Sequence, residues 1–125
     1  MKYKLGWFIV AAGLLAGSCE DKKEGKCTET KISQHGESES HNAGANCMNC
    51  HANGGEGEGC FNVAGTVYDS LLSSTISNVV IKLYTEPNGA GTLKYTINAD
   101  ANGNFYTTEN MAASGLYPAI VGPTQ

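Results

Sequence analysis

Cys47, Cys50 and His51 form a C-x-x-C-H motif, in which two thiols lie three positions apart and an imidazole follows directly. This pattern is typical of the covalent attachment of haem c. A single tight turn brings both sulfurs to one edge of the porphyrin, where each can add to a vinyl group. The next residue then falls under the iron and supplies its proximal ligand. The motif therefore predicts one bound haem, attached at Cys47 and Cys50, with His51 as the proximal axial ligand.

The other histidines, His35 and His41, lie upstream of the motif, which favours an axial role for one of them. A distal ligand must reach the haem face opposite His51. The ten positions from His41 to His51 allow such a loop at about 3.3 Å per extended residue. His41 is preferred because it leads directly into the turn before the motif, and His35 is the alternative. Met111 also stays open, whereas Met48 lies inside the attachment turn.

The same residues admit a second interpretation without haem. In it the C-x-x-C-H motif binds zinc, and His41 and Cys60 supply a second pair of ligands. A variant of this view treats the two motif cysteines as a thiol–disulfide couple. Adjacent Cys50 and His51 are awkward joint ligands of one tetrahedral site, and a thioredoxin-like motif expects a βαβ context that the sequence lacks. Haem attachment is therefore the preferred prediction.

The N-terminus has the features of a lipoprotein signal peptide over residues 1–18. Lysines at the start precede an apolar run, residues 5–16, that suits the hydrophobic region of a secretory signal. Small residues then precede Cys19, which predicts cleavage before this cysteine and its lipidation. The alternative is an ordinary signal peptide with a free cysteine nearby. Lipidation would anchor the protein to a membrane of the bacterial cell envelope, and the charged residues that follow predict a flexible tether over 19–32.

The chain has 5 cysteines, an odd number that asks for an explanation in an exported protein. If Cys19 carries lipid and the motif carries haem, Cys27 and Cys60 remain, one on each side of the motif. A disulfide can form between them in an oxidising compartment. We therefore hypothesise a Cys27–Cys60 bridge, which no spacing rule forces.

From residue 61 onward the hydrophobic pattern changes to the alternation that is typical of half-buried strands. Polar turns separate the expected strands, which are 61–68, 78–84, 92–97, 105–108 and 116–121. Pro118 confines the last of them to a sheet edge, because proline has no N–H to donate. The expected fold is mainly β: a small antiparallel β-sandwich, complete or incomplete, over residues 61–125. An N-terminal signal helix and an irregular haem-binding segment, residues 33–60, precede it.

Two short stretches each have two possible interpretations. Residues 52–60 are rich in glycine, so either the backbone passes close to a flat cofactor or the stretch is a plain linker. Asp100, Asn102 and Asn104 have the spacing of a calcium loop. They lack its remaining acidic ligands, so a tight turn is preferred.

Composition narrows the classes of function. The net charge is -4 and the chain has no arginine, so nucleic acid is a poor candidate partner. A haem enzyme or gas sensor would need an open distal face with acid–base groups beside it. Residues 33–60 are too few to build such a walled pocket. No Ser-His-Asp arrangement and no phosphate loop is apparent.

Two sets of residues resemble known families. Residues 65–69, 79–84 and 100–105 resemble the carboxypeptidase regulatory-like (prealbumin-like) β-sandwich, which typically reads G-x-V-x-D, V-x-V-x-L and T-D-x-x-G-x-F. Ala99 stands here in place of the usual threonine. Residues 41–51, with the glycine-rich stretch and first strand that follow, look like a group of exported bacterial c-type cytochrome lipoproteins. In that group a haem-binding segment precedes such a sandwich.

The resemblance covers residues 33–121 and implies an electron carrier without enzymatic activity. Its implied partners are redox proteins of the bacterial envelope, and its implied location is the periplasmic side of the outer membrane or the cell surface. Similar proteins often continue to a second C-x-x-C-H, so the chain is either a short member or a piece of a longer one. The alternative function is a non-catalytic binding or structural lipoprotein whose functional part is the sandwich, and whose C-x-x-C-H binds zinc or acts as a thiol pair.

Overall fold

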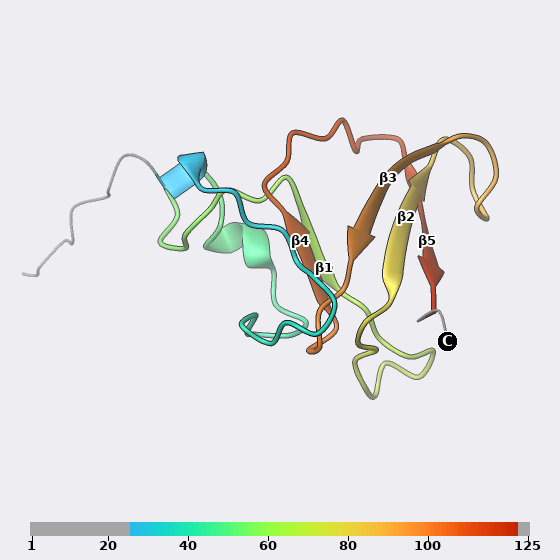
Figure 1. The fold of residues 1–125 in the computed structure, drawn as a ribbon, viewed down its shortest axis with the longest axis horizontal. Helices are drawn as coiled ribbons and strands as arrows, with labels where there is room; N and C mark the ends of the chain where they lie inside the picture. Colours follow the sequence, from blue (N-terminus) through green and yellow to red (C-terminus); the bar gives the residue numbers. More distant parts are fainter. Residues whose placement is uncertain (1–25, 123–125) are drawn as a thin grey trace, which may run out of the picture.

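The computed structural model describes residues 26–122, which form two small antiparallel sheets with an irregular segment beside them (Figure 1). The strands are β1 (Val63–Thr66), β2 (Val80–Tyr84), β3 (Leu93–Asn98), β4 (Asn104–Thr107) and β5 (Tyr117–Val121). The helical elements of the described residues are the short 3-10 turns η1 (Lys26–Thr28) and η2 (Cys47–Asn49). The mainly β fold class that the sequence predicts is therefore confirmed.

β2 is the central strand of the larger sheet, which has the order β3-β2-β5. Ile81 and Leu83, together with Val79 just before the strand, are buried in the core. Successive side chains of a strand point to opposite faces, so this alternation places one whole face of β2 inside the protein. This buried face agrees with the alternation that the sequence predicts for the strand over 78–84.

The alternation of buried and exposed side chains that is expected for β3 does not hold at its first residue, Leu93. Ile97 lies opposite Ile81 and is buried, but Leu93 is 43% exposed. A register shift between Leu83 and Tyr84 pairs Tyr84 with Leu93, and such a bulge changes the direction in which the strand presents its side chains. Leu93 therefore does not join the apolar face that the alternation predicts.

β5 lies at the edge of the larger sheet and pairs antiparallel with β2. Pro118 is opposite Leu83 in this pairing. Because the other side of β5 has no neighbouring strand in the sheet, a residue without an N–H is tolerated there. The edge position that Pro118 predicts for this strand is confirmed.

The smaller sheet consists of β1 and β4, and it supports the irregular segment that carries the motif. Gly65 lies opposite Phe105, and a Cβ on Gly65 would lie 2.7 Å from Cζ of the Phe105 ring. Phe105 and Val63 pack against the buried residues of the larger sheet, so both sheets contribute to one core. Figure 1 shows the segment before β1 beside this smaller sheet, away from β5.

Residues 26–32, which composition assigns to the flexible tether, belong instead to the folded part. Lys31 and Thr108 are joined by a backbone hydrogen bond of 2.9 Å from Thr108 N–H to the Lys31 carbonyl. Ile32 forms an antiparallel bridge to Thr107 of β4. The tether prediction is wrong for this part, because composition does not reveal contacts between distant residues: backbone hydrogen bonds form whatever the side chains are, and Cys27 is also linked to Cys60.

The predicted signal peptide, residues 1–18, lies outside the described residues, as do Cys19 and the first part of the tether. Within residues 26–122, no helix has the length and apolar character needed to cross a membrane.

Candidate functional site

The motif cysteines and histidine lie on one tight turn. The carbonyl oxygen of Cys47, the first residue of η2, accepts from the N–H groups of Cys50 at 3.2 Å and His51 at 2.9 Å. Asn46 caps the turn, because its side-chain oxygen accepts from the N–H of Met48 at 3.1 Å. Residues three and four positions apart in a helical turn share a face. The two free thiols and the imidazole therefore project to one side of the turn.

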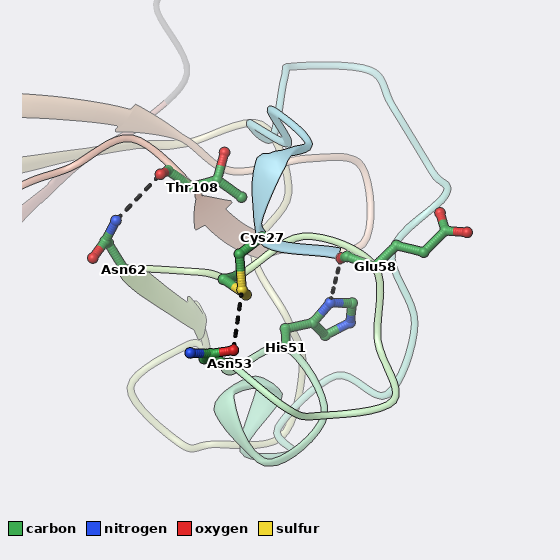
Figure 2. The surroundings of a disulfide bond; sticks show 7 residues. Cys27, His51, Asn53, Glu58, Asn62 and Thr108 are labelled. Carbon is green, nitrogen blue, oxygen red and sulfur yellow. Dashed lines mark hydrogen bonds between the residues drawn. A yellow bond between two sulfur atoms is a disulfide. The ribbon is translucent and has the colours of Figure 1, made fainter. Parts of the chain in front are cut away.

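His51 has a defined tautomer (Figure 2). Its Nδ1 lies 2.8 Å from the carbonyl oxygen of Glu58, and because a carbonyl can only accept, Nδ1 carries the proton. In the neutral ring, this hydrogen bond leaves the lone pair on Nε2. A histidine that ligates a metal almost always donates its other ring N–H in this way. The hydrogen bond thus prepares His51 to bind a metal through Nε2.

The ring of His51 rests on a column of aromatic rings. It stacks on Phe61 with centroids 4.2 Å apart and planes 10° from parallel, and Phe61 stacks on Tyr106 at 4.9 Å. Tyr106 belongs to β4, so the column fixes His51 against the smaller sheet. Partial burial, assisted by the negative charges of nearby carboxylates, raises the pKa of Tyr106 above its usual value of 10.0.

The glycine-rich stretch, residues 52–60, packs tightly around the motif. The N–H of Gly57 donates to the carbonyl of Cys50 at 2.8 Å, and the N–H of Phe61 donates to the carbonyl of His51 at 2.8 Å. A Cβ on Gly57 would lie 2.7 Å from Nδ1 of His51, so a larger residue would displace the ring. The stretch is therefore not a plain linker, and the flat group that its backbone approaches is the imidazole of His51.

Cys27 and Cys60 form a disulfide that closes this loop onto the start of the described chain (Figure 2). It is the pairing that the cysteine count suggests. The bond joins residues 33 positions apart. Cross-linking a loop of that length stabilises a fold by about 3–4 kcal/mol, because it lowers the entropy of the unfolded chain. Cys60 directly precedes Phe61 and closely follows Glu58, so the disulfide secures the residues that orient His51.

The motif opens onto a pocket of about 540 Å³, within the range of about 300–1,000 Å³ that is usual for ligand and cofactor sites. Both motif thiols, His51 and His41 line this pocket. Other lining side chains are the aromatic rings of the column, the amide of Asn104 and the exposed charged groups Lys31, Glu39, Glu56 and Glu58. The pocket thus combines a few ligand atoms with aromatic walls and a charged rim.

His41 lies close to His51 across the pocket, with ring centroids 6.2 Å apart and planes tilted by 42°. An imidazole nitrogen binds a metal at about 2.0 Å and lies about 1.2 Å from its own ring centroid, so two imidazoles on opposite sides of one metal have centroids about 6.4 Å apart. The spacing of His41 and His51 therefore suits the two axial ligands of one iron.

His35 and Met111, the other ligand candidates, are engaged elsewhere. Nε2 of His35 donates to the carbonyl oxygen of Val79 at 3.2 Å, and His35 does not line the pocket. Met111 packs against the apolar core between the sheets. The structure therefore brings His41, rather than His35 or Met111, to the motif.

A tetrahedral metal site is not formed by the described residues. Among residues 26–122, no three His, Cys, Asp or Glu side chains converge so as to hold a metal ion. A structural zinc site needs four protein ligands, and Cys60, which the zinc interpretation requires, is in the disulfide. A haem needs fewer, because the porphyrin supplies the equatorial nitrogens. Two thiols on one face and two spaced imidazoles fit a covalent haem better than a zinc ion.

Sequence reasoning missed several residues that shape the pocket. Phe61 is assigned by its pattern to the first strand and Tyr106 to the fourth, with no sign that the two rings stack. Asn104 is identified only as a turn residue. The nearest available signal is the position of Phe61, a large aromatic residue directly after Cys60 and the glycine-rich stretch.

Comparisons with protein-family models, curated proteins and solved structures find no match. The residues that meet in the pocket are therefore the basis for assigning a function.

Proposed function

We propose that this chain is a c-type cytochrome that transfers single electrons through one haem covalently bound at Cys47 and Cys50. The observation that carries the proposal is that both thiols, His51 and His41 line one pocket, with the two rings at axial spacing. A chance C-x-x-C-H sequence gives no reason for a second histidine at that distance. It also gives no reason for Nδ1 of His51 to donate to a backbone carbonyl, as ligating histidines do.

Each protein group has a defined task in this proposal. The turn at Cys47 fixes the two sulfurs on one side, so that both reach the same porphyrin edge. The Glu58 carbonyl orients His51, and a hydrogen bond to Nδ1 raises the basicity of the ligating nitrogen. Haem, when bound, supplies the reversible one-electron couple between ferric and ferrous iron.

The arrangement supports electron transfer rather than catalysis. If His51 and His41 both bound the haem iron, they would leave no coordination site for a substrate. His41 is exposed, and the exposed rim of the pocket leaves the cofactor edge accessible to another redox protein. We propose redox proteins of the bacterial envelope as partners, and membrane attachment through lipid on Cys19. The electron carrier itself is not an enzyme in this proposal.

The test is expression of the chain with haem-maturation machinery, followed by a pyridine haemochrome spectrum and an intact mass. We expect the mass of one haem on the protein and the haemochrome spectrum of two thioether bonds. Cys47→Ser combined with Cys50→Ser is expected to abolish the covalent haem, while Cys27→Ser combined with Cys60→Ser leaves it attached. Stoichiometric zinc without haem, or no cofactor on the wild-type chain, would overturn the proposal.

A separate measurement tests the anchor. Acylation of Cys19 predicts a mass increase of the mature chain and its recovery in the membrane fraction. Cys19→Ser is expected to release the protein while the haem spectrum stays unchanged.

A further inference from the structure

The turn between β3 and β4 is held in place by hydrogen bonds around a buried carboxylate. Asp100 is fully buried, and its Oδ1 accepts from the backbone N–H groups of Asn102 at 2.9 Å and Asn104 at 3.0 Å. The N–H of Asp100 in turn donates to the carbonyl of Asn104 at 2.8 Å. Gly103 has φ +81, a conformation that L side chains rarely adopt. The turn therefore holds the side chains of Asn102 and Asn104 in fixed positions.

Both of these side chains bind the backbone segment that carries His41. The Nδ2 of Asn102 donates to the carbonyl of Ser40 at 2.8 Å and to that of Ser38 at 3.2 Å. The Nδ2 of Asn104 donates to the hydroxyl of Ser40 at 2.9 Å and to the carbonyl of His41 at 3.5 Å. Asn104 is 2% exposed and lines the pocket, and its two bonds to this segment are partly buried.

A second contact holds the chain just after His41. The hydroxyl of Thr66 in β1 donates to Oδ1 of Asn104 at 2.6 Å and accepts from the N–H of Gly44 at 2.9 Å. Thr66 and Asn104 are partners in the β1–β4 ladder, so the sheet sets their distance. His41 is thus fastened to the smaller sheet on both sides of its own position.

The segment has no regular structure to place His41 by itself. Residues 38–42 belong to no helix or strand, and the His41 side chain is exposed. Without the two asparagines, the backbone there would have few partners, and the ring would sample many positions. The position of the His41 ring therefore depends on contacts with β1 and the β3–β4 turn.

We propose that Asn104 is a positioning residue, which together with Asn102 and Thr66 holds His41 at the axial position opposite His51. This inference rests on the proposed function and extends it, because it names the sheet residues that set the sixth iron ligand. A stable sixth ligand keeps the iron low-spin and closed to external ligands. A loosened one exchanges with solvent and opens the position to carbon monoxide.

The test compares holo wild-type protein with Asn104→Ala, His41→Ala and the matched control Asn62→Ala. Asn62 is also in the β domain, and its amide donates to two backbone carbonyls, Thr108 and Glu109, but it does not line the pocket. The readouts are the low-spin fraction of the ferric protein and the rate of carbon monoxide binding to the ferrous protein. Hydrogen–deuterium exchange of residues 38–44 reports the segment itself.

We expect His41→Ala to be high-spin and open to carbon monoxide, and Asn62→Ala to match the wild type. Asn104→Ala removes the amide hydrogen bonds to Ser40 and His41 and the one accepted from Thr66. This loss predicts about a tenfold larger population with His41 dissociated, and carbon monoxide binding faster by the same factor. Exchange of residues 38–44 is expected to rise in Asn104→Ala. The Ser40 hydroxyl accepts from Nδ2 of Asn102 at 3.2 Å as well as from Asn104. Ser40→Ala removes this hydroxyl without altering the turn, and it replaces Asn104→Ala in the test if that variant does not fold.

The outcomes separate the two proposals. A wild-type protein with no haem spectrum overturns the proposed function. A haem protein in which His41→Ala stays low-spin shows that another residue is the sixth ligand, and overturns the further inference. The inference also fails if His41→Ala is high-spin while both Asn104→Ala and Ser40→Ala bind carbon monoxide as slowly as the wild type.

Discussion

His51 donates its Nδ1 proton to the backbone carbonyl of Glu58, at 2.8 Å, and not to the carboxylate of that residue. The carboxylate lies instead 3.6 Å from Nζ of Lys31. The orientation of the His51 ring therefore depends on the path of the glycine-rich backbone rather than on a charged side chain. Substitution of Glu58 leaves the acceptor in place, whereas a change in the backbone beside the ring does not.

Gly57→Ala tests this dependence on the backbone. The added methyl group would lie 2.7 Å from Nδ1 of His51, so the ring or the loop must move. Overpacking of this kind costs about 1–3 kcal/mol of stability. We expect a lower midpoint of urea unfolding and a changed reduction potential of the holo protein. Glu58→Gln is the control for side-chain charge and is expected to stay within about 1 kcal/mol of the wild type.

A second control isolates the effect of adding a methyl group. A Cβ on Gly122 would have no heavy atom within 4 Å, so Gly122→Ala is expected to change neither property. If Gly57→Ala has the reduction potential and the unfolding midpoint of the wild type, the close approach of the backbone to His51 affects neither the haem nor the stability.

Phe61→Ala removes the ring on which His51 stacks. Phe61 is 9% exposed, and truncating a buried phenylalanine costs about 3–5 kcal/mol. We therefore expect a large loss of stability, measured by urea unfolding, and a lower yield of attached haem. Phe61→Leu keeps most of the apolar volume, so it is expected to lose less stability than Phe61→Ala. It removes the flat face under His51, so we expect broader electron paramagnetic resonance lines from a wider range of His51 orientations. Equal spectra for Phe61→Leu and wild type would argue against a role for the stack in orienting His51.

Tyr106 gives the protein an alkaline pH dependence. Its folded-state pKa is raised above 10.0, first by burial and then by nearby negative charges. A proton held more tightly in the folded state contributes stability that is fully present below the unfolded pKa. That stability is lost as the pH rises through the higher folded value. We expect the wild type to lose stability above pH 10.0 more steeply than Tyr106→Phe, which cannot ionise at this position.

Urea unfolding across this alkaline window measures the difference, and an absorbance titration of the phenolates identifies the group. The titration of Tyr106→Phe should lack a transition with a midpoint above 10.0 that the wild type shows. Parallel stability curves for the two proteins would contradict the prediction.

The double variant Cys27→Ser/Cys60→Ser separates the disulfide from the haem attachment. Loss of the cross-link is expected to lower the free energy of unfolding by about 3–4 kcal/mol, because the unfolded chain gains entropy. The haem should remain covalently bound, since its thioether bonds use Cys47 and Cys50. Mass spectrometry measures attachment, and urea unfolding of the same samples measures stability. An unchanged unfolding midpoint would show that the disulfide does not constrain this loop.

Part of the fold could be predicted because it depends on spacing along the chain. The alternation of Val79, Ile81 and Leu83 identifies β2 and its buried face, since side chains of a strand point alternately to opposite sides. The C-x-x-C-H spacing places Cys47 and His51 on one face of a turn by the same local logic. The sequence could not reveal that residues 31–33 run along β4, because that contact joins positions more than 70 residues apart through backbone groups and two hydroxyls, those of Ser33 and Thr108, which follow no periodic pattern.

The sequence by itself determined the attachment motif, the strand segments and the edge position that Pro118 imposes on β5. Each follows from the geometry of a few consecutive residues. Only the tertiary structure decided which histidine lies beside His51, because that choice rests on the hydrogen bond between Asn104 and Ser40, 64 positions apart. Hydrophobic periodicity shows which face of an element is buried, but polar contacts between a turn and an irregular segment leave no periodic trace. They exist only once the two sheets have brought those residues together.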